Sequence, residues 1–226
     1  MSKQSLPDAS TSTKCSPFHP DDASRRNSLT TAASASELTC TKVSLQSALR
    51  QFPDFPTPGI NFVDIMPLFS DPKLHTSLIR ALELQVQISY DGKLPDIIVG
   101  LDARGFLFGP SLALRLGAGF APVRKRNKLP GPTFEASYVK EYGADHFQIQ
   151  KDAIKKGQSV LIVDDIIATV PYSCTSGGSA QAAGKLVEDA GGIIIGYLFI
   201  LEIEFLKGCD KLNAPASVLL SESLFT

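Results

Sequence analysis

A long apolar run at residues 160–169 most constrains what this chain can fold into. Apolar, largely β-branched residues fill its first part, which is typical of a strand buried on both faces of a parallel sheet. Asp164 and Asp165 interrupt the run, and two adjacent carboxylates cannot stay buried without a partner. We therefore expect the strand to reach the surface at these two aspartates.

A glycine turn and a helix follow the aspartates. Gly177, Gly178 and Ser179 form the turn, and apolar residues then recur at helical spacing. Glycines let the backbone approach an anion closely, and the free N–H groups at a helix start bind it. Paired carboxylates nearby accept hydrogen bonds from vicinal hydroxyls or hold Mg²⁺ through its water shell. The block therefore predicts a sugar-phosphate site; the competing interpretation is that the aspartates only cap a helix or a turn.

Strands and helices alternate along most of the chain. Buried strands are predicted at 96–101, 118–123, 192–201 and 217–220, and helices at 71–89, 105–116 and 179–190. This alternation predicts an α/β fold with a central, mainly parallel sheet flanked by helices, and with ligands at the carboxyl ends of its strands. The polar stretch 134–149 predicts a hairpin of a length suited to a mobile lid.

The N-terminal part has a different composition. Residues 1–42 are rich in Ser and Thr without helical or strand periodicity, so we predict a disordered tail there and one folded domain over 43–226. Within the domain, a short helix is predicted at 43–52, ended by Pro53. The proline-dense stretch up to Gly59 is predicted to be an ordered loop.

Charge and cysteine content argue against several classes of function. A formal net charge of −1 argues against a nucleic-acid or membrane-surface binder. The four cysteines are scattered without CxxC spacing, which argues against a zinc site or a disulfide framework and fits a reducing, cytoplasmic location. No apolar stretch reaches membrane-spanning length, and the start lacks the apolar core of a signal peptide.

The apolar run and the glycine turn resemble the 5-phosphoribosyl 1-pyrophosphate (PRPP) signature of the type I phosphoribosyltransferases. Further segments resemble the adenine-specific branch of that family, in the family's order: 55–60, 100–110, 124–131 and 141–143. The resemblance implies the type I fold with a small hood and a flexible lid hairpin. It also implies purine salvage, in which adenine and PRPP give AMP and pyrophosphate. The implied cofactor is Mg²⁺ carried by PRPP, with no direct protein ligand, and the implied assembly is a homodimer.

The same resemblance implies a role for each matching residue. Ribose and 5′-phosphate are assigned to Asp164, Asp165, Ala168, Thr169, Ser176, Gly177, Gly178 and Ser179, with the aspartates gripping ribose hydroxyls. Pyrophosphate is assigned to Asp102, Ala103, Arg104, Arg124, Lys125 and Lys128. Adenine is assigned to Ile60, Asn61 and Phe62, and catalysis to Glu141, Tyr142 and Arg104. From the residues alone, the basic run 124–128 also fits a solvated charged face, and Phe62 also fits packing on the core.

One departure from the family pattern lies in the phosphate loop. The family runs from the aspartates straight through Ala-Thr-Gly-Gly-Ser, whereas residues 170–176 intervene here. Either Thr169 stays in place and the insert loops out, or Ser176 replaces the threonine hydroxyl; a third alternative is a translation artefact or a variant form. The insert is the reason for the alternative prediction of function, a non-catalytic or impaired nucleotide-binding variant.

Overall fold

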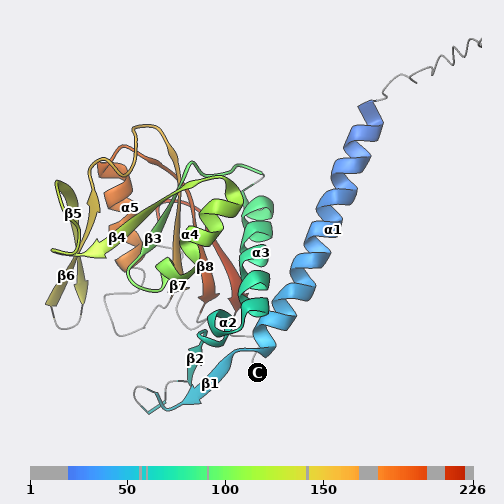
Figure 1. The fold of residues 1–226 in the computed structure, drawn as a ribbon, viewed down its shortest axis with the longest axis horizontal. Coiled ribbons are helices and arrows are strands. Elements are labelled where there is room, and N and C mark those ends of the chain that lie inside the picture. The colour runs from blue at the N-terminus through green and yellow to red at the C-terminus, as the bar shows by residue number, and fades with distance from the viewer. Residues whose placement is uncertain are drawn as a thin grey trace, which may run out of the picture.

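The computed structural model describes residues 20–55, 58–59, 61–90, 92–140, 143–167, 178–202 and 212–221. Within these residues seven strands form one sheet, in the spatial order β5-β6-β4-β3-β7-β8-β9 (Figure 1). The strands are β3 (Ile97–Leu101), β4 (Gly119–Lys125), β5 (Thr133–Lys140), β6 (Gly143–Gln150), β7 (Ser159–Ile167), β8 (Ile193–Glu202) and β9 (Ala216–Ser221). β3, β4, β7, β8 and β9 pair in parallel, and the hairpin of β5 and β6 joins β4 antiparallel. The predicted α/β fold and the hairpin are confirmed.

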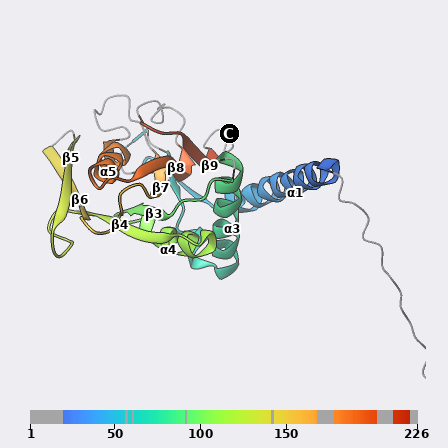
Figure 2. The same ribbon diagram turned by 90° about the horizontal axis from the view of Figure 1, so that it is seen from above.

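Helices cover both faces of this sheet. α3 (Pro72–Ser89) and α4 (Gly105–Leu116) pack on one face, and α5 (Gly178–Asp189) packs on the other (Figure 2). Successive residues of β7 alternate between the two faces of the sheet. Val163 belongs to the core under α3 and α4, and Ile162 belongs to the core under α5. The strand is therefore buried on both faces, as its apolar run predicts.

Local sequence signals set the ends of the predicted helices. Asp71 caps α3, since its carboxylate accepts hydrogen bonds from the N–H groups of Lys73 at 2.7 Å and Leu74 at 3.3 Å. Pro72 follows at the first helical position, where no N–H partner is needed. Gly117 ends α4 in the left-handed conformation, with a φ of 70°.

The N-terminal helix differs from the expectation. α1 (Pro20–Ser47) is helical where the sequence predicts a tail. Leu38 and Leu45, two turns apart, are buried against the body, and this spacing is too sparse to show a helical period among Ser and Thr. Glu37 also binds Arg80 of α3 through two contacts of 2.8 Å. The domain boundary at residue 42 stays a prediction.

The segment after α1 also differs. Arg50–Pro53 forms β1, which pairs antiparallel with β2 (Asn61–Asp64), so the predicted helix at 43–52 and the predicted loop are wrong at these residues. Pairing between strands decides the conformation here, and Arg50 contacts the Asp64 carboxylate at 2.6 Å. The hairpin projects from the body beside the short helix α2 (Pro67–Ser70) and forms the expected hood (Figure 1).

Candidate active site

The strand order creates a switch point between β3 and β7. The chain leaves β3 for β4 on one side, and leaves β7 for β8 on the other. In open parallel sheets a crevice forms at such a point, outside the carboxyl ends of the two strands. Asp102, Ala103 and Arg104 follow β3, and the paired aspartates lie towards the end of β7. Two of the predicted site segments are therefore neighbours in the fold.

Glycines bring the turn after β3 close to β7. A Cβ added to Gly105, the first residue of α4, would lie 2.9 Å from the carbonyl oxygen of Val163. A Cβ added to Gly100 or Gly109 would lie 2.8 Å or 2.6 Å from the ring of Phe120. Gly105 therefore lets the start of α4 approach β7, whereas Gly100 and Gly109 leave room for the Phe120 ring. The peptide bond between Asp102 and Ala103 is cis.

An ion pair joins the two neighbouring segments. Arg104 Nε lies 2.7 Å from Asp165 Oδ2, although the N–H is not aligned for a hydrogen bond. The Asp165 side chain is 5% exposed, whereas that of Arg104 is 46% exposed and reaches towards solvent. The guanidinium therefore balances a buried carboxylate while keeping open faces for a ligand.

The two aspartates lie within β7, two residues before its end, and not at the end itself as predicted. Successive residues of a strand point to opposite faces, so Asp164 and Asp165 have different surroundings. Burial and the neighbouring Asp165 carboxylate raise the pKa of Asp164 well above its usual range. Asp164 also accepts a hydrogen bond from the Asp165 N–H at 2.9 Å. Asp164 is thus half-buried and already accepts one backbone hydrogen bond.

The end of β4 supplies positive charge beside this pair. Arg124 Nε lies 3.1 Å from Asp102 Oδ2, and its guanidinium lies 6.0 Å from the ring centre of Phe106 in α4. Arg124 also donates to the carbonyl of Lys128 at 3.4 Å, which draws the turn after β4 towards the site. Lys125 is exposed and lies 4.0 Å from Asp145 of the hairpin. The basic run therefore lies against the turn after β3. Its positive side chains are thus placed close to the predicted site.

The hood and the phosphate turn complete the list of predicted segments. Asn61 donates to the Gln51 side chain at 3.1 Å, and Phe62 meets Phe55 edge to face with ring centres 5.4 Å apart. Gly178 and Ser179 form the first turn of α5. The predicted site residues Ile60, Glu141, Tyr142, Ala168, Thr169, Ser176 and Gly177, and the insert 170–176, lie outside the described residues.

Comparison with known proteins identifies relatives of this chain. The model of the phosphoribosyl transferase domain matches residues 73–202. The adenine phosphoribosyltransferases of Debaryomyces hansenii and Yarrowia lipolytica are 55% and 56% identical over 177 residues, which is 78% of this chain and 89% and 93% of theirs. The Saccharomyces cerevisiae enzyme, solved with an imino-altritol bisphosphate and adenine, is 52% identical with a TM-score of 0.75, covering 80% of this chain and 99% of that one.

The chain belongs to the adenine phosphoribosyltransferase family. Its family-matched region includes the turn after β3, the basic end of β4 and the aspartates of β7, so the fold and the order of the predicted segments agree with the family. The N-terminal helix α1 precedes the region matched by the phosphoribosyl transferase domain.

The sequence did not predict two features of this site. The first is the ion pair of Arg104 with Asp165. The sequence could not select Asp165, because the adjacent Asp164 carries the same kind of side chain. The second is Phe106, which supports the Arg124 guanidinium and meets Phe120 edge to face with ring centres 6.1 Å apart. The sequence shows only that Phe106 is an aromatic residue directly after the turn glycine. This position does not reveal that Phe106 contacts Arg124.

Proposed function

We propose that this chain converts adenine and PRPP into AMP and pyrophosphate. The observation that carries the proposal is the Arg104–Asp165 pair at the switch point, which joins the anion-binding turn of β3 to the acidic strand β7. Displacement at an anomeric carbon needs a neutralised leaving group, a fixed ribose phosphate and a positioned nucleophile. The turn after β3, the end of β4, the aspartates of β7 and the start of α5 support the first two requirements. The third rests on the resemblance of the hood and of residues 141–142 to the family.

The pyrophosphate would lie over the turn after β3. Backbone N–H groups of Ala103 and Arg104 and the cations of Arg124, Lys125 and Lys128 would neutralise it. Asp102 is itself an anion and contacts Arg124 at 3.1 Å, so its role is to orient that guanidinium. This gives the positive groups a fixed geometry before the leaving group gains charge.

The two aspartates would have separate tasks. Asp164 would hydrogen-bond the ribose hydroxyls, and its raised pKa favours the protonated carboxyl, which can donate as well as accept. Asp165 would hold Arg104, because its carboxylate is already paired and buried. The 5′-phosphate would bind the first turn of α5 at Gly178 and Ser179, with the hydroxyl of Thr169 or Ser176 as a further donor.

Adenine would bind under the hood, with Phe62 on one face of the base. The base N9 would form a bond to the anomeric carbon as the carbon–oxygen bond to pyrophosphate breaks, and the N9 proton would pass to Glu141. Tyr142 would shield the reacting carbon from water. These assignments of Glu141, Tyr142, Ile60 and Asn61 follow from the family pattern.

Mg²⁺ would enter the site on PRPP. Among the described residues, no group of three or more His, Cys, Asp or Glu side chains is placed to hold a metal ion. Mg²⁺ prefers oxygen ligands and keeps several waters, and PRPP would supply the phosphate oxygens. When bound, the ion would neutralise negative charge on the pyrophosphate.

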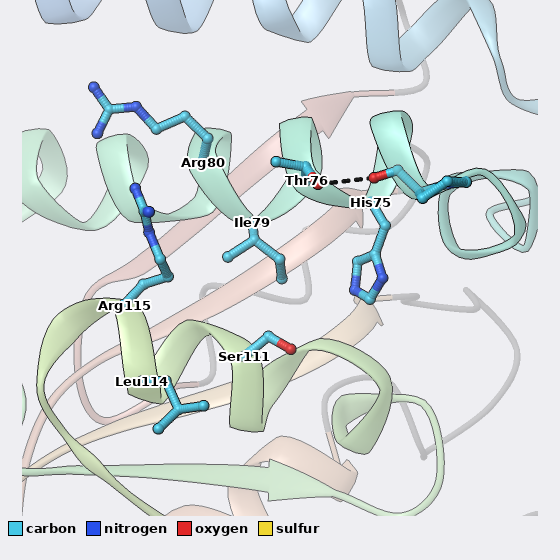
Figure 3. A pocket seen from close by; sticks show the side chains of 8 residues that line it. His75, Thr76, Ile79, Arg80, Ser111, Leu114 and Arg115 are labelled. Carbon is cyan, nitrogen blue, oxygen red and sulfur yellow. Dashed lines mark hydrogen bonds between the residues drawn. The ribbon is translucent and has the colours of Figure 1, made fainter.

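A homodimer is the assembly we propose. Leu107 and Leu114 of α4 are 40% and 83% exposed, and Leu114 lines a pocket of about 670 Å³ between α3 and α4 (Figure 3). His75 and Ile79 of α3 line this pocket together with Leu114. A two-fold interface uses the same patch on both subunits, so the apolar face of α4 could pack on its own copy. The cytoplasmic location is likewise a proposal, and no helix in the described part is long and apolar enough to cross a membrane.

The decisive assay compares the full chain with a variant that lacks residues 170–176. Both chains are incubated with adenine, PRPP and Mg²⁺, and AMP and pyrophosphate are quantified. We expect AMP from the full chain, in which the insert loops out or Ser176 completes the phosphate turn. Activity in the deletion variant alone would instead support an impaired nucleotide-binding form. Inactivity of both chains with adenine and other purines would overturn the proposed reaction.

A further inference from the structure

A buried hydroxyl on β8 meets the middle of α5. Tyr197 of β8 is fully buried, and a Cβ added to Gly184 of α5 would overlap its hydroxyl oxygen. The next atoms that this Cβ would meet belong to Asn213 and Ile194, at 3.4 Å and 3.5 Å, which is ordinary contact. The helix therefore packs this closely on the sheet because residue 184 has no side chain.

Hydrogen bonds tie the same hydroxyl to the end of α5. Tyr197 Oη donates to Asn213 Oδ1 at 2.7 Å, and Asn213 Nδ2 donates to Glu188 in the last turn of the helix. Burial and Glu188 raise the pKa of Tyr197 to about 12, so the hydroxyl keeps its proton at neutral pH. It thus contacts the helix at its middle and is linked to its C-terminal end.

We propose that Tyr197 is a positioning residue that sets the height and axial position of α5, and through them the place where the 5′-phosphate binds. The inference rests on the proposed function, which puts that phosphate at Gly178 and Ser179. Gly178 lies about 9 Å from Gly184 along the axis, and a helix with intact hydrogen bonds carries a displacement at its middle to its first turn. Tyr197 itself does not touch the substrate.

Size complementation tests this role. G184A places a methyl group against the Tyr197 hydroxyl, so α5 must shift, and we expect the Kd for AMP to rise about tenfold. Adenosine lacks the phosphate, and its Kd should stay within about twofold of the wild-type value. The double variant Y197F/G184A removes the hydroxyl that the methyl group overlaps and should recover most of the AMP affinity. Y197F alone should weaken AMP binding less than G184A does.

Tyr90 offers a matched control on the other side of the same strand. It is buried, and its hydroxyl donates to the backbone carbonyl of Tyr197 at 2.7 Å. Y90F therefore removes a comparable buried hydrogen bond without touching α5. We expect Y90F to lower the free energy of unfolding to an extent similar to that of Y197F, while the Kd for AMP stays at the wild-type value.

Titration calorimetry with AMP and with adenosine on the full-length chains provides the readout. A wild-type chain that binds neither ligand would overturn the proposed function and, with it, this inference. If the wild-type chain binds AMP, three results would overturn the role of Tyr197 alone: equal weakening of AMP and adenosine by G184A, no recovery in the double variant, or the same AMP loss in Y90F. Should G184A fail to fold, the Kd for AMP is compared between Y197F and Y90F instead. A rise in Y197F alone would support the role of Tyr197, and equal values would overturn it.

Discussion

Single residues at the switch point have charges that depend on one another. Asp165 is buried and has Arg104 as its ion-pair partner, whereas Asp164 is hydrogen-bonded to the Asp165 backbone and has a raised pKa. The two adjacent carboxylates therefore have different partners, and burial together with the Asp165 charge raises the pKa of Asp164. This difference leads to two predictions at the scale of the residue.

Replacing Arg104 should expose the cost of the buried Asp165 carboxylate. We expect R104Q to lower the free energy of unfolding by about 1–3 kcal/mol, since a buried charge is left unpaired. R115Q is the matched control, because Glu83 loses Arg115 but keeps Arg80 at 3.2 Å, and should cost less than about 1 kcal/mol. Urea denaturation measures both, and equal losses in the two variants would contradict the role of the Arg104–Asp165 pair.

Replacing Asp164 should stabilise the fold and reduce activity. Because the folded-state pKa of Asp164 is raised, the native state holds a proton that the unfolded chain has lost, so this group makes the wild-type chain less stable as pH rises through that interval. We expect D164N to raise the free energy of unfolding at pH 7 by about 0.5–2 kcal/mol. The advantage should shrink as pH falls towards the ordinary Asp range.

Asp96 is the control of opposite sign for that experiment. Its carboxylate accepts hydrogen bonds from the N–H and the hydroxyl of Ser159, both at 2.8 Å, and the backbone bond is the larger cause of its lowered pKa. Its stabilisation is present above the ordinary Asp pKa and is lost as pH falls through the lowered value. D96N should therefore reduce stability at pH 7. Thermal unfolding from pH 3 to 8 gives the unfolding temperature of each variant relative to the wild-type chain. If D164N and D96N changed this temperature in the same direction, the opposite pKa shifts of Asp164 and Asp96 would be contradicted.

At the scale of the element, the position of α4 depends on the glycines at its start. We expect G105A to push the helix away from the Val163 carbonyl, which a Cβ would approach to 2.9 Å, and to cost about 1–3 kcal/mol. G119A is the control, because its Cβ would meet the mobile tip of Ile97 at 2.8 Å and that side chain can move. Chemical denaturation and AMP formation should both show the larger loss in G105A. Similar losses of stability and of AMP formation in both variants would contradict a specific requirement for the close contact between Gly105 and β7.

The N-terminal helix shows how one element depends on a distant one. Leu38 and Leu45 are buried and Glu37 contacts Arg80 of α3, so α1 is held by partners that follow it in the chain. A segment rich in Ser and Thr has a weak intrinsic helix propensity. Most of the stability of such a helix comes from its packing on another element. The tail prediction missed this because its partner lies in another element.

For the whole molecule, the exposed apolar face of α4 leads to a prediction about assembly. We expect the wild-type chain to behave as a dimer, and L114E to dissociate it by placing a charge in the apolar contact. V43E is the control, since Val43 is also exposed on a helix, at 64%, but lies on α1. Analytical ultracentrifugation gives the masses. A monomeric wild-type chain, or dissociation by V43E as well, would contradict the proposed α4 interface.

The sequence by itself determined the α/β alternation, the ends of α3 and α4 and the buried strand β7, because caps, glycines and apolar periodicity act within a few residues of one another. Through the order of the family segments, it also predicted which residues contact the ligands. Only the tertiary structure decided that α1 is a helix, that Arg50–Pro53 is a strand and that Asp165 takes Arg104. Each of these depends on a contact between segments far apart in the chain, and local propensity contains no information about such partners.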